Sequence, residues 1–126
     1  MLAQNFKSAE ELGLTEKGLA GLLKVLCMLE GGELVFSKEC LVPNGFNMNY
    51  CWSQNECGTV GCIGGWAGFY DQSGLVHGMR GDSTKPVYRL NLGLLFCPLG
   101  RYKHDYTVEQ ASHALRTYLV TGIPDW

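Results

Sequence analysis

The sequence predicts a mainly α-helical protein of about four helices with a short β-hairpin or irregular insert, folded as a single compact domain over residues 1–126. Two segments, near residues 15–29 and 107–119, carry apolar residues at the three- and four-residue spacing of an amphipathic helix. A chain of this length can bury one hydrophobic core. Apolar residues make up 46% and charged residues 17%, which excludes a mainly disordered protein.

The first predicted helix follows Thr15, which suits the N-cap position, and it ends at Gly31-Gly32. Leu14 precedes the cap and can pack against Leu19. The apolar positions that share one face of this helix are Leu19, Leu22, Leu23, Leu26 and Leu29.

The helical period disappears between Glu33 and Gln54. Leu34–Phe36 is a short apolar segment, and apolar residues alternate with polar ones from Phe46 to Trp52. Pro43-Asn44-Gly45 is typical of a turn, so a small hairpin is expected around it.

Residues 59–70 are apolar and rich in glycine, and we interpret them as a buried central helix that Thr59 caps. Gly61 and Gly65, and likewise Gly64 and Gly68, are four residues apart, which would leave a smooth helix face for a close neighbour. A loop is expected over residues 71–89, followed by a short apolar helix, Leu90–Phe96.

The last predicted helix begins with a capping box, Thr107 and Gln110, and ends at Gly122 and Pro124. Its apolar positions follow at helical spacing up to Leu119. The residues expected in the core of the whole domain are Leu22, Leu26, Leu29, Phe46, Trp52, Ile63, Trp66, Phe69, Leu94, Phe96, Leu115 and Leu119.

Charge and segment composition favour a cytoplasmic protein that does not enter a membrane. No apolar run approaches about 18 residues, and Met1–Lys7 lacks the pattern of a secretory signal. The formal net charge of −2 excludes a generally basic nucleic-acid binder. Six cysteines make the chain cysteine-rich, and a cytoplasmic setting would keep most of them as thiols.

A specific motif lies in Cys57–Ala67, which reads Cys-Gly-Thr-Val-Gly-Cys-Ile-Gly-Gly-Trp-Ala. With its surroundings it resembles a family of small uncharacterised bacterial and phage proteins that carry Cys-Gly-Thr-x-x-Cys-Ile-x-Gly-Trp-Ala. The resemblance covers about residues 46–126, including Phe46–Met48, Trp52, Leu92–Phe96, Pro98 and the final helix from Tyr106 to Gly122. It implies a small, mainly helical cytoplasmic protein, in the host cytoplasm if phage-encoded, and it assigns no catalytic residue.

Cys57 and Cys62 allow several interpretations. They can be buried thiols, a disulfide, or two ligands of a metal site, but structural zinc needs four ligands and no second pair at such spacing follows. We therefore expect no metal and no cofactor. If the chain is an enzyme, Cys57 is the candidate nucleophile, because a position just before a helix favours the thiolate. No spacing places a histidine beside it.

Basic and aromatic residues gather between His77 and His104. This segment contains five lysines and arginines but a single acidic residue, Asp82. Arginine and tyrosine are common anchors of protein interfaces, and cations with aromatics also suit nucleic-acid backbones. We call this set the basic patch and expect it to bind a partner: Arg80, Lys85, Tyr88, Arg89, Arg101, Tyr102 and Lys103.

These observations favour a non-catalytic protein-binding module of bacterial or phage origin. The phage association of the resembling family extends this hypothesis to inhibition of a host defence complex, an anti-CRISPR-like role. Two alternatives stay open: a cysteine-dependent or metal-dependent enzyme centred on Cys57 and Cys62, and a nucleic-acid contact module that uses the basic patch.

Replacing Arg89 and Arg101 together by alanine tests the basic patch. We expect partner retention to fall while the melting temperature stays unchanged, because an exposed side chain contributes within about 0.5 kcal/mol to stability and an interface arginine about 2 kcal/mol to affinity. Retention that nuclease abolishes would identify a nucleic-acid partner. Equal retention by the variant and the parent would show that the patch is a solvated loop.

Overall fold

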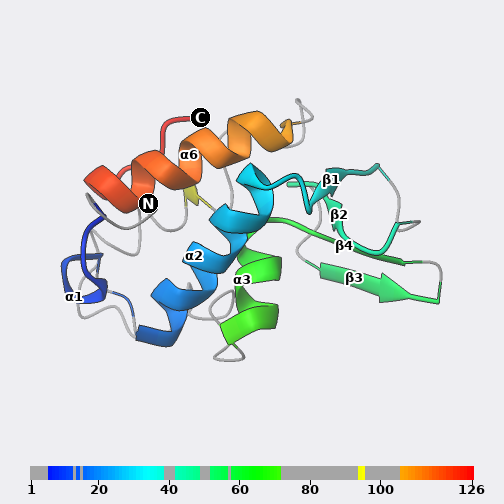
Figure 1. Cartoon of the computed structure of the whole chain (residues 1–126), viewed down its shortest axis with the longest axis horizontal. Coiled ribbons are helices and arrows are strands. Elements are labelled where there is room, and N and C mark those ends of the chain that lie inside the picture. The colour runs from blue at the N-terminus through cyan, green and yellow to red at the C-terminus, as the bar shows by residue number, and fades with distance from the viewer. Residues whose placement is uncertain are drawn as a thin grey trace.

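Helices and a four-stranded sheet form the described part of the computed structural model (Figure 1). The structure describes residues 6–12, 14, 16–38, 42–48, 52–56, 58–71, 94–95 and 106–126. In chain order the elements are α1 (Ala9–Leu12), α2 (Glu16–Glu30), β1 (Val35–Phe36), β2 (Gly45–Phe46), β3 (Trp52–Asn55), β4 (Gly58–Gly61), α3 (Ile63–Asp71) and α6 (Val108–Thr121). Leu94 and Leu95 are also helical.

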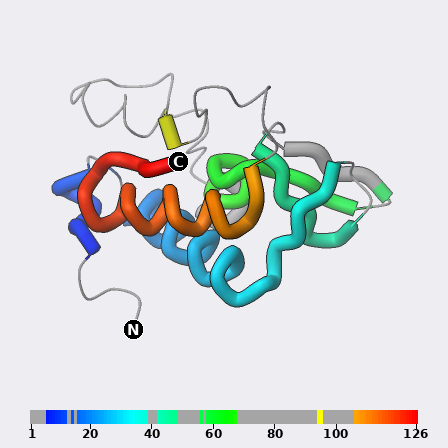
Figure 2. Tube along the Cα trace, turned by 90° about the horizontal axis from the view of Figure 1, so that it is seen from above, coloured from blue at the N-terminus to red at the C-terminus, as the bar shows by residue number. Residues whose placement is uncertain are grey.

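The first long helix, α2, confirms the prediction from hydrophobic periodicity. Its buried apolar side chains include Leu22, Leu26 and Leu29, and it packs against both α3 and α6 (Figures 1 and 2). The predicted cap, Thr15, lies outside the described residues. Packing on two sides explains why this helix holds so much of the apolar core.

The short helix α1 is an element that the sequence analysis missed. Ser8 and Glu11 form a capping box: the Glu11 N–H donates to Ser8 Oγ at 3.2 Å, and the Ser8 N–H donates to Glu11 Oε1 at 3.0 Å. The backbone hydrogen bond from Ser8, with that of its hydroxyl, lowers the pKa of the Glu11 carboxyl.

The sheet has the order β1-β2-β4-β3. β1 and β2 pair in parallel, as do β2 and β4, and only β3 and β4 form an antiparallel hairpin in the described part of the chain. The expected hairpin around Pro43-Asn44-Gly45 is therefore wrong in position: this turn leads into β2, which runs parallel to β1. A hairpin does precede the glycine-rich helix, with Asn55 opposite Gly58.

The glycine-rich segment is a strand followed by a helix rather than one helix. Residues Gly58–Gly61 form β4, which pairs on both sides, and α3 starts at Ile63. The prediction that Thr59 caps the helix is wrong, because Thr59 lies within β4. Gly61 and Gly65 consequently share no helix face, although Gly64 and Gly65 are both buried within α3.

The last helix, α6, confirms its predicted boundaries. The Gln110 N–H donates to Thr107 Oγ1 at 3.1 Å and the Thr107 N–H donates to Gln110 Oε1 at 2.8 Å, and the Gly122 N–H closes the helix on the Tyr118 carbonyl at 2.7 Å. Burial raises the pKa of Tyr118, whose hydroxyl has no hydrogen-bond partner among the described residues.

The chain after α6 folds back along that helix. The Asp125 N–H donates to Thr117 Oγ1 at 2.9 Å, and Asp125 Oδ2 lies 2.9 Å from His113 Nε2. The Trp126 indole donates to the Leu94 carbonyl at 3.0 Å, so the C-terminus lies beside the helical residues Leu94 and Leu95 (Figure 2).

Most of the predicted core is confirmed. At most 3% of the surface of each of these residues is exposed: Leu22, Leu26, Leu29, Phe46, Ile63, Trp66, Leu115 and Leu119. Leu94 is only half-buried, while Phe96 and the side chains of Trp52 and Phe69 lie outside what is described. Within the residues that the structure describes, no helix combines the length and apolar character needed to span a bilayer.

Replacing Gly65 by leucine tests the packing of α3 on α2. We expect the free energy of unfolding to fall by about 1–3 kcal/mol, because Gly65 is buried and a leucine side chain must displace its neighbours. Ala20→Leu, which adds a leucine at an exposed position of α2, is the control and should change stability by no more than about 0.5 kcal/mol. Equal thermal midpoints for the two variants would show that this part of α3 is not packed.

Candidate functional site

The residues predicted to bind a partner cannot be placed, because all of them lie outside the described residues: Arg80, Lys85, Tyr88, Arg89, Arg101, Tyr102 and Lys103. The same holds for Cys57. The partner-binding role of the basic patch therefore stays a prediction.

The structure places Cys62 at the N-terminus of α3. Its side chain is 2% exposed, and its sulfur accepts a hydrogen bond from the Gly65 N–H at an N···S distance of 3.4 Å. The Cys62 carbonyl accepts the first helical hydrogen bond, from the Trp66 N–H. Cys62 thus acts as the N-cap of the helix. Among the described residues, no three His, Cys, Asp or Glu side chains gather in a way that could hold a metal ion.

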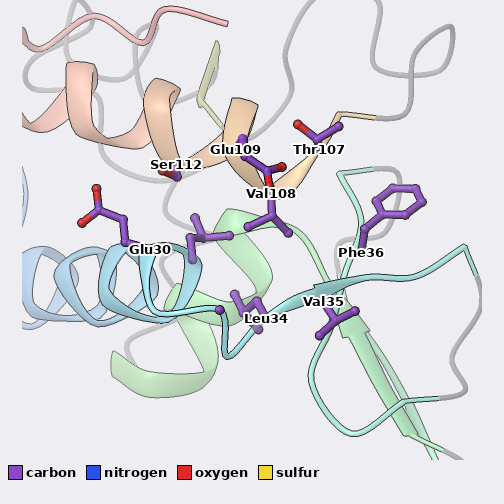
Figure 3. Close-up of a pocket in the computed structure, with 10 residues that line it drawn as sticks. Glu30, Leu34, Val35, Phe36, Thr107, Val108, Glu109 and Ser112 are labelled. Carbon is purple, nitrogen blue, oxygen red and sulfur yellow. The ribbon is translucent and has the colours of Figure 1, made fainter.

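A pocket opens instead between the end of α2, β1 and the first turn of α6 (Figure 3). Its volume is about 710 Å³. In Figure 3 Val108 projects from α6 toward β1, and the Phe36 ring lies on the α6 side of the strand while Val35 points to the other side. The described residues that line it are Leu29, Glu30, Gly32, Leu34, Val35, Phe36, Thr107, Val108, Glu109 and Ser112.

The floor of this pocket depends on the turn from α2 into β1. Gly32 has φ of 75°, a left-handed conformation that glycine adopts without steric cost. The Glu33 and Leu34 N–H groups both donate back to the Met28 carbonyl, which turns the chain sharply at the helix end. Leu34 is buried as a result, whereas the next residue, Val35, is 55% exposed.

An ion pair joins the two helices beside the pocket. Arg116 donates to both oxygens of Glu30, from Nε at 2.9 Å and from Nη2 at 2.7 Å. The guanidinium carbon also lies 5.5 Å from the centre of the Phe6 ring. This two-bond geometry connects α2 and α6 at this point.

The second carboxylate of the pocket, Glu109, is exposed and forms no ion pair with any described residue. It lies in the first turn of α6, where the helix dipole favours a negative charge. Because Arg116 neutralises Glu30, Glu109 is the carboxylate of the described lining that has no ion-pair partner among the described residues.

This pocket was not predicted from the sequence. One signal was available: Leu34-Val35-Phe36 is an apolar run that begins one residue after the double glycine Gly31-Gly32. Successive side chains of a strand point to opposite faces, so a short edge strand cannot bury all three against one core. The contribution of Thr107, Val108 and Glu109 could not be read from the sequence, because they are more than 70 residues further along the chain.

Substitutions of Gly32 test the turn that shapes the pocket. Gly32→Ala should lower the free energy of unfolding by about 1–2 kcal/mol because alanine disfavours the left-handed region, and Gly32→Asn should cost less. Crowding does not contribute, since an added Cβ would have no described atom within 4 Å. Urea denaturation measures both values, and a smaller loss for alanine than for asparagine would contradict this account of the turn.

Comparison of the chain with protein families, with curated proteins and with solved structures found no match in any of the three. The resemblance of Cys57–Ala67 to bacterial and phage proteins therefore stays a prediction from the sequence. The pocket between β1 and α6 is the candidate functional site of the described chain.

Proposed function

We propose that the chain is a non-catalytic protein-binding module and that its partner docks at the pocket between β1 and α6. The main supporting observation is a pocket with apolar lining residues beside an exposed edge strand: Phe36 lies on the α6 side of β1, and Val35, on the other face of the strand, is 55% exposed. An exposed apolar surface with a polar rim is typical of an interaction site.

The chemistry of the lining supports contact rather than reaction. Among the described lining residues, the polar side chains are those of Glu30, Glu109, Thr107 and Ser112, and none is a histidine, cysteine or lysine. The Thr107 hydroxyl caps α6, and Arg116 binds both oxygens of Glu30. The Thr107 hydroxyl and the Glu30 carboxylate are therefore engaged in structural hydrogen bonds. A nucleophile with an adjacent base would need a different set of side chains.

The origin and biological role extend this proposal. A bacterial or phage protein that acts in the cytoplasm and inhibits a host defence complex, as an anti-CRISPR protein does, would be a small binding module of this kind. The support for this part is the resemblance of the Cys57–Ala67 segment, and it adds no residue to the docking site.

Val35→Lys tests the docking site. The immobilised full chain is used to capture proteins from bacterial lysate, and we expect the variant to retain at least about tenfold less of any partner that the parent captures. A lysine at this exposed edge adds charge without entering the core, so the melting temperature should not change. Val120→Lys is the matched control, because Val120 is also exposed, at 37%, and lies near the opposite end of α6.

Equal loss in the two variants, or no loss in Val35→Lys, would contradict a docking site at the pocket. Mass spectrometry of the proteins lost from Val35→Lys alone tests the wider proposal. A component of a defence complex would support the inhibitory role, and an unrelated protein would contradict it. Loss of capture after nuclease treatment would indicate a nucleic acid instead.

A further inference from the structure

The outer edge of β1 has backbone groups available for a further strand. The Val35 N–H donates to the Asn44 carbonyl at 3.0 Å and the Ser37 N–H donates to the Phe46 carbonyl at 3.0 Å. In this parallel register the N–H and C=O of Phe36 point away from β2. No described residue bonds to either group, and β1 is an end strand of the sheet.

These two backbone groups restrict what can cover the edge. A partner that buries the Phe36 N–H and C=O must supply an acceptor and a donor, because an unpaired buried backbone group is costly. A helix uses its own backbone groups internally and cannot do so. An extended segment can, and the antiparallel direction is favoured because this pairing is the more stable one per residue and lets a single residue exchange both hydrogen bonds with Phe36.

The lining of the pocket favours one kind of side chain at the position of the added segment that lies opposite Phe36. Residues directly opposite each other in an antiparallel pair point to the same face, so the residue facing Phe36 would project toward α6, as the Phe36 ring does (Figure 3). Leu29, Leu34 and Val108 line the space there, which favours an apolar side chain.

The carboxylate of Glu109 adds a charge requirement. On an added strand, side chains that share a face are two residues, or about 6.6 Å, apart. A lysine or arginine two positions from the apolar residue would therefore lie on the same side as Glu109, which has no ion-pair partner among the described residues. A residue directly adjacent to the apolar one would point to the opposite face.

We infer that the pocket binds an extended peptide segment of a partner protein, added antiparallel to β1, with an apolar side chain next to Phe36 and a basic side chain two positions away from it. This inference rests on the proposed function, because it names the partner chemistry of the same docking site. The mode is strand addition to an exposed sheet edge.

The test uses four blocked synthetic peptides and the full ¹⁵N-labelled chain. Peptide TKTVTKT has a lysine two positions from valine on each side, and TTKVKTT has the same composition with both lysines adjacent to valine. TETVTET replaces the lysines by glutamate. The fourth is TKTVTKT with an N-methyl group on valine, which removes the peptide N–H that would donate to Phe36.

We expect TKTVTKT to bind about three- to fivefold more tightly than TTKVKTT, which loses the ion pair with Glu109. It should bind at least about tenfold more tightly than TETVTET, whose glutamates repel Glu109, and than the N-methylated peptide, which loses a backbone hydrogen bond. Bound peptide should slow hydrogen exchange of the Phe36 amide at least about tenfold, because this amide becomes hydrogen-bonded only in the complex. Glu109→Gln should lower the affinity for TKTVTKT by about three- to fivefold, as expected for the loss of one exposed ion pair. The matched variant Glu16→Gln, in the first turn of α2, should leave this affinity unchanged.

Several results would overturn the inference. The first is that TKTVTKT does not bind at about 1 mM. The second is that the N-methylated peptide binds as tightly as unmodified TKTVTKT, and the third is that hydrogen exchange of the Phe36 amide is equally fast in the free chain and in the complex. Sedimentation of the free chain as a dimer that Val35→Lys dissociates would assign the edge to a second copy. If Val35→Lys abolishes partner capture but no peptide binds, the docking site stands and the strand addition is wrong; if capture persists, the proposed function itself is wrong.

Discussion

The hydrogen bond from the Trp66 indole to the Gly45 carbonyl, at 2.9 Å and buried, connects the helices to the sheet. Trp66 belongs to α3, which packs on α2, and Gly45 belongs to β2, which lies between β1 and β4. This bond holds β2 against α3, and β1 is hydrogen-bonded to β2. The bond therefore contributes to the position of β1, which forms one wall of the pocket. Glycine is required there, because a Cβ at residue 45 would lie 2.7 Å from the Thr59 carbonyl oxygen. The close approach of β2 and β4 that excludes a side chain also brings the carbonyl within reach of the indole.

The pocket is preformed because each of its walls is fixed by interactions that do not involve a partner. The left-handed Gly32 directs the chain out of α2, the capping box of Thr107 holds the first turn of α6, and Arg116 joins α6 to Glu30. A site that needs no rearrangement loses less conformational entropy when it binds. A low entropic cost is important for the proposed peptide complex, because it forms few contacts. Two backbone hydrogen bonds and one apolar side chain would leave little free energy to order a flexible binding site.

The helices α2 and α6 could be predicted because their signals are local: apolar residues recur at helical spacing, and caps stand at known offsets from them. The strands could not, since β1 and β2 are two residues long and their pairing joins Val35, Gly45 and Val60, which are distant in the chain. Gly61 suggested close helix packing with Gly65, yet Gly61 belongs to β4, a strand with neighbours on both sides. The candidate site was missed for the same reason, because its residues come from separate elements whose meeting depends on the tertiary fold.

The two carboxylates of the pocket, Glu30 and Glu109, differ in whether another side chain of the described structure binds them. Arg116 engages both oxygens of Glu30, so this charge is neutralised in the folded chain and contributes to the contact between α2 and α6. Glu109 interacts favourably with the dipole of α6 but remains exposed and without an ion-pair partner in the described structure. An exposed pair is worth at most about 1 kcal/mol and is screened beyond about 8 Å at physiological salt. The charge can therefore select among peptides that already fit the edge and the apolar space, but it cannot recruit a partner alone. Discrimination then depends on the two-residue spacing between the apolar and the basic side chain, which only an extended segment places on one face.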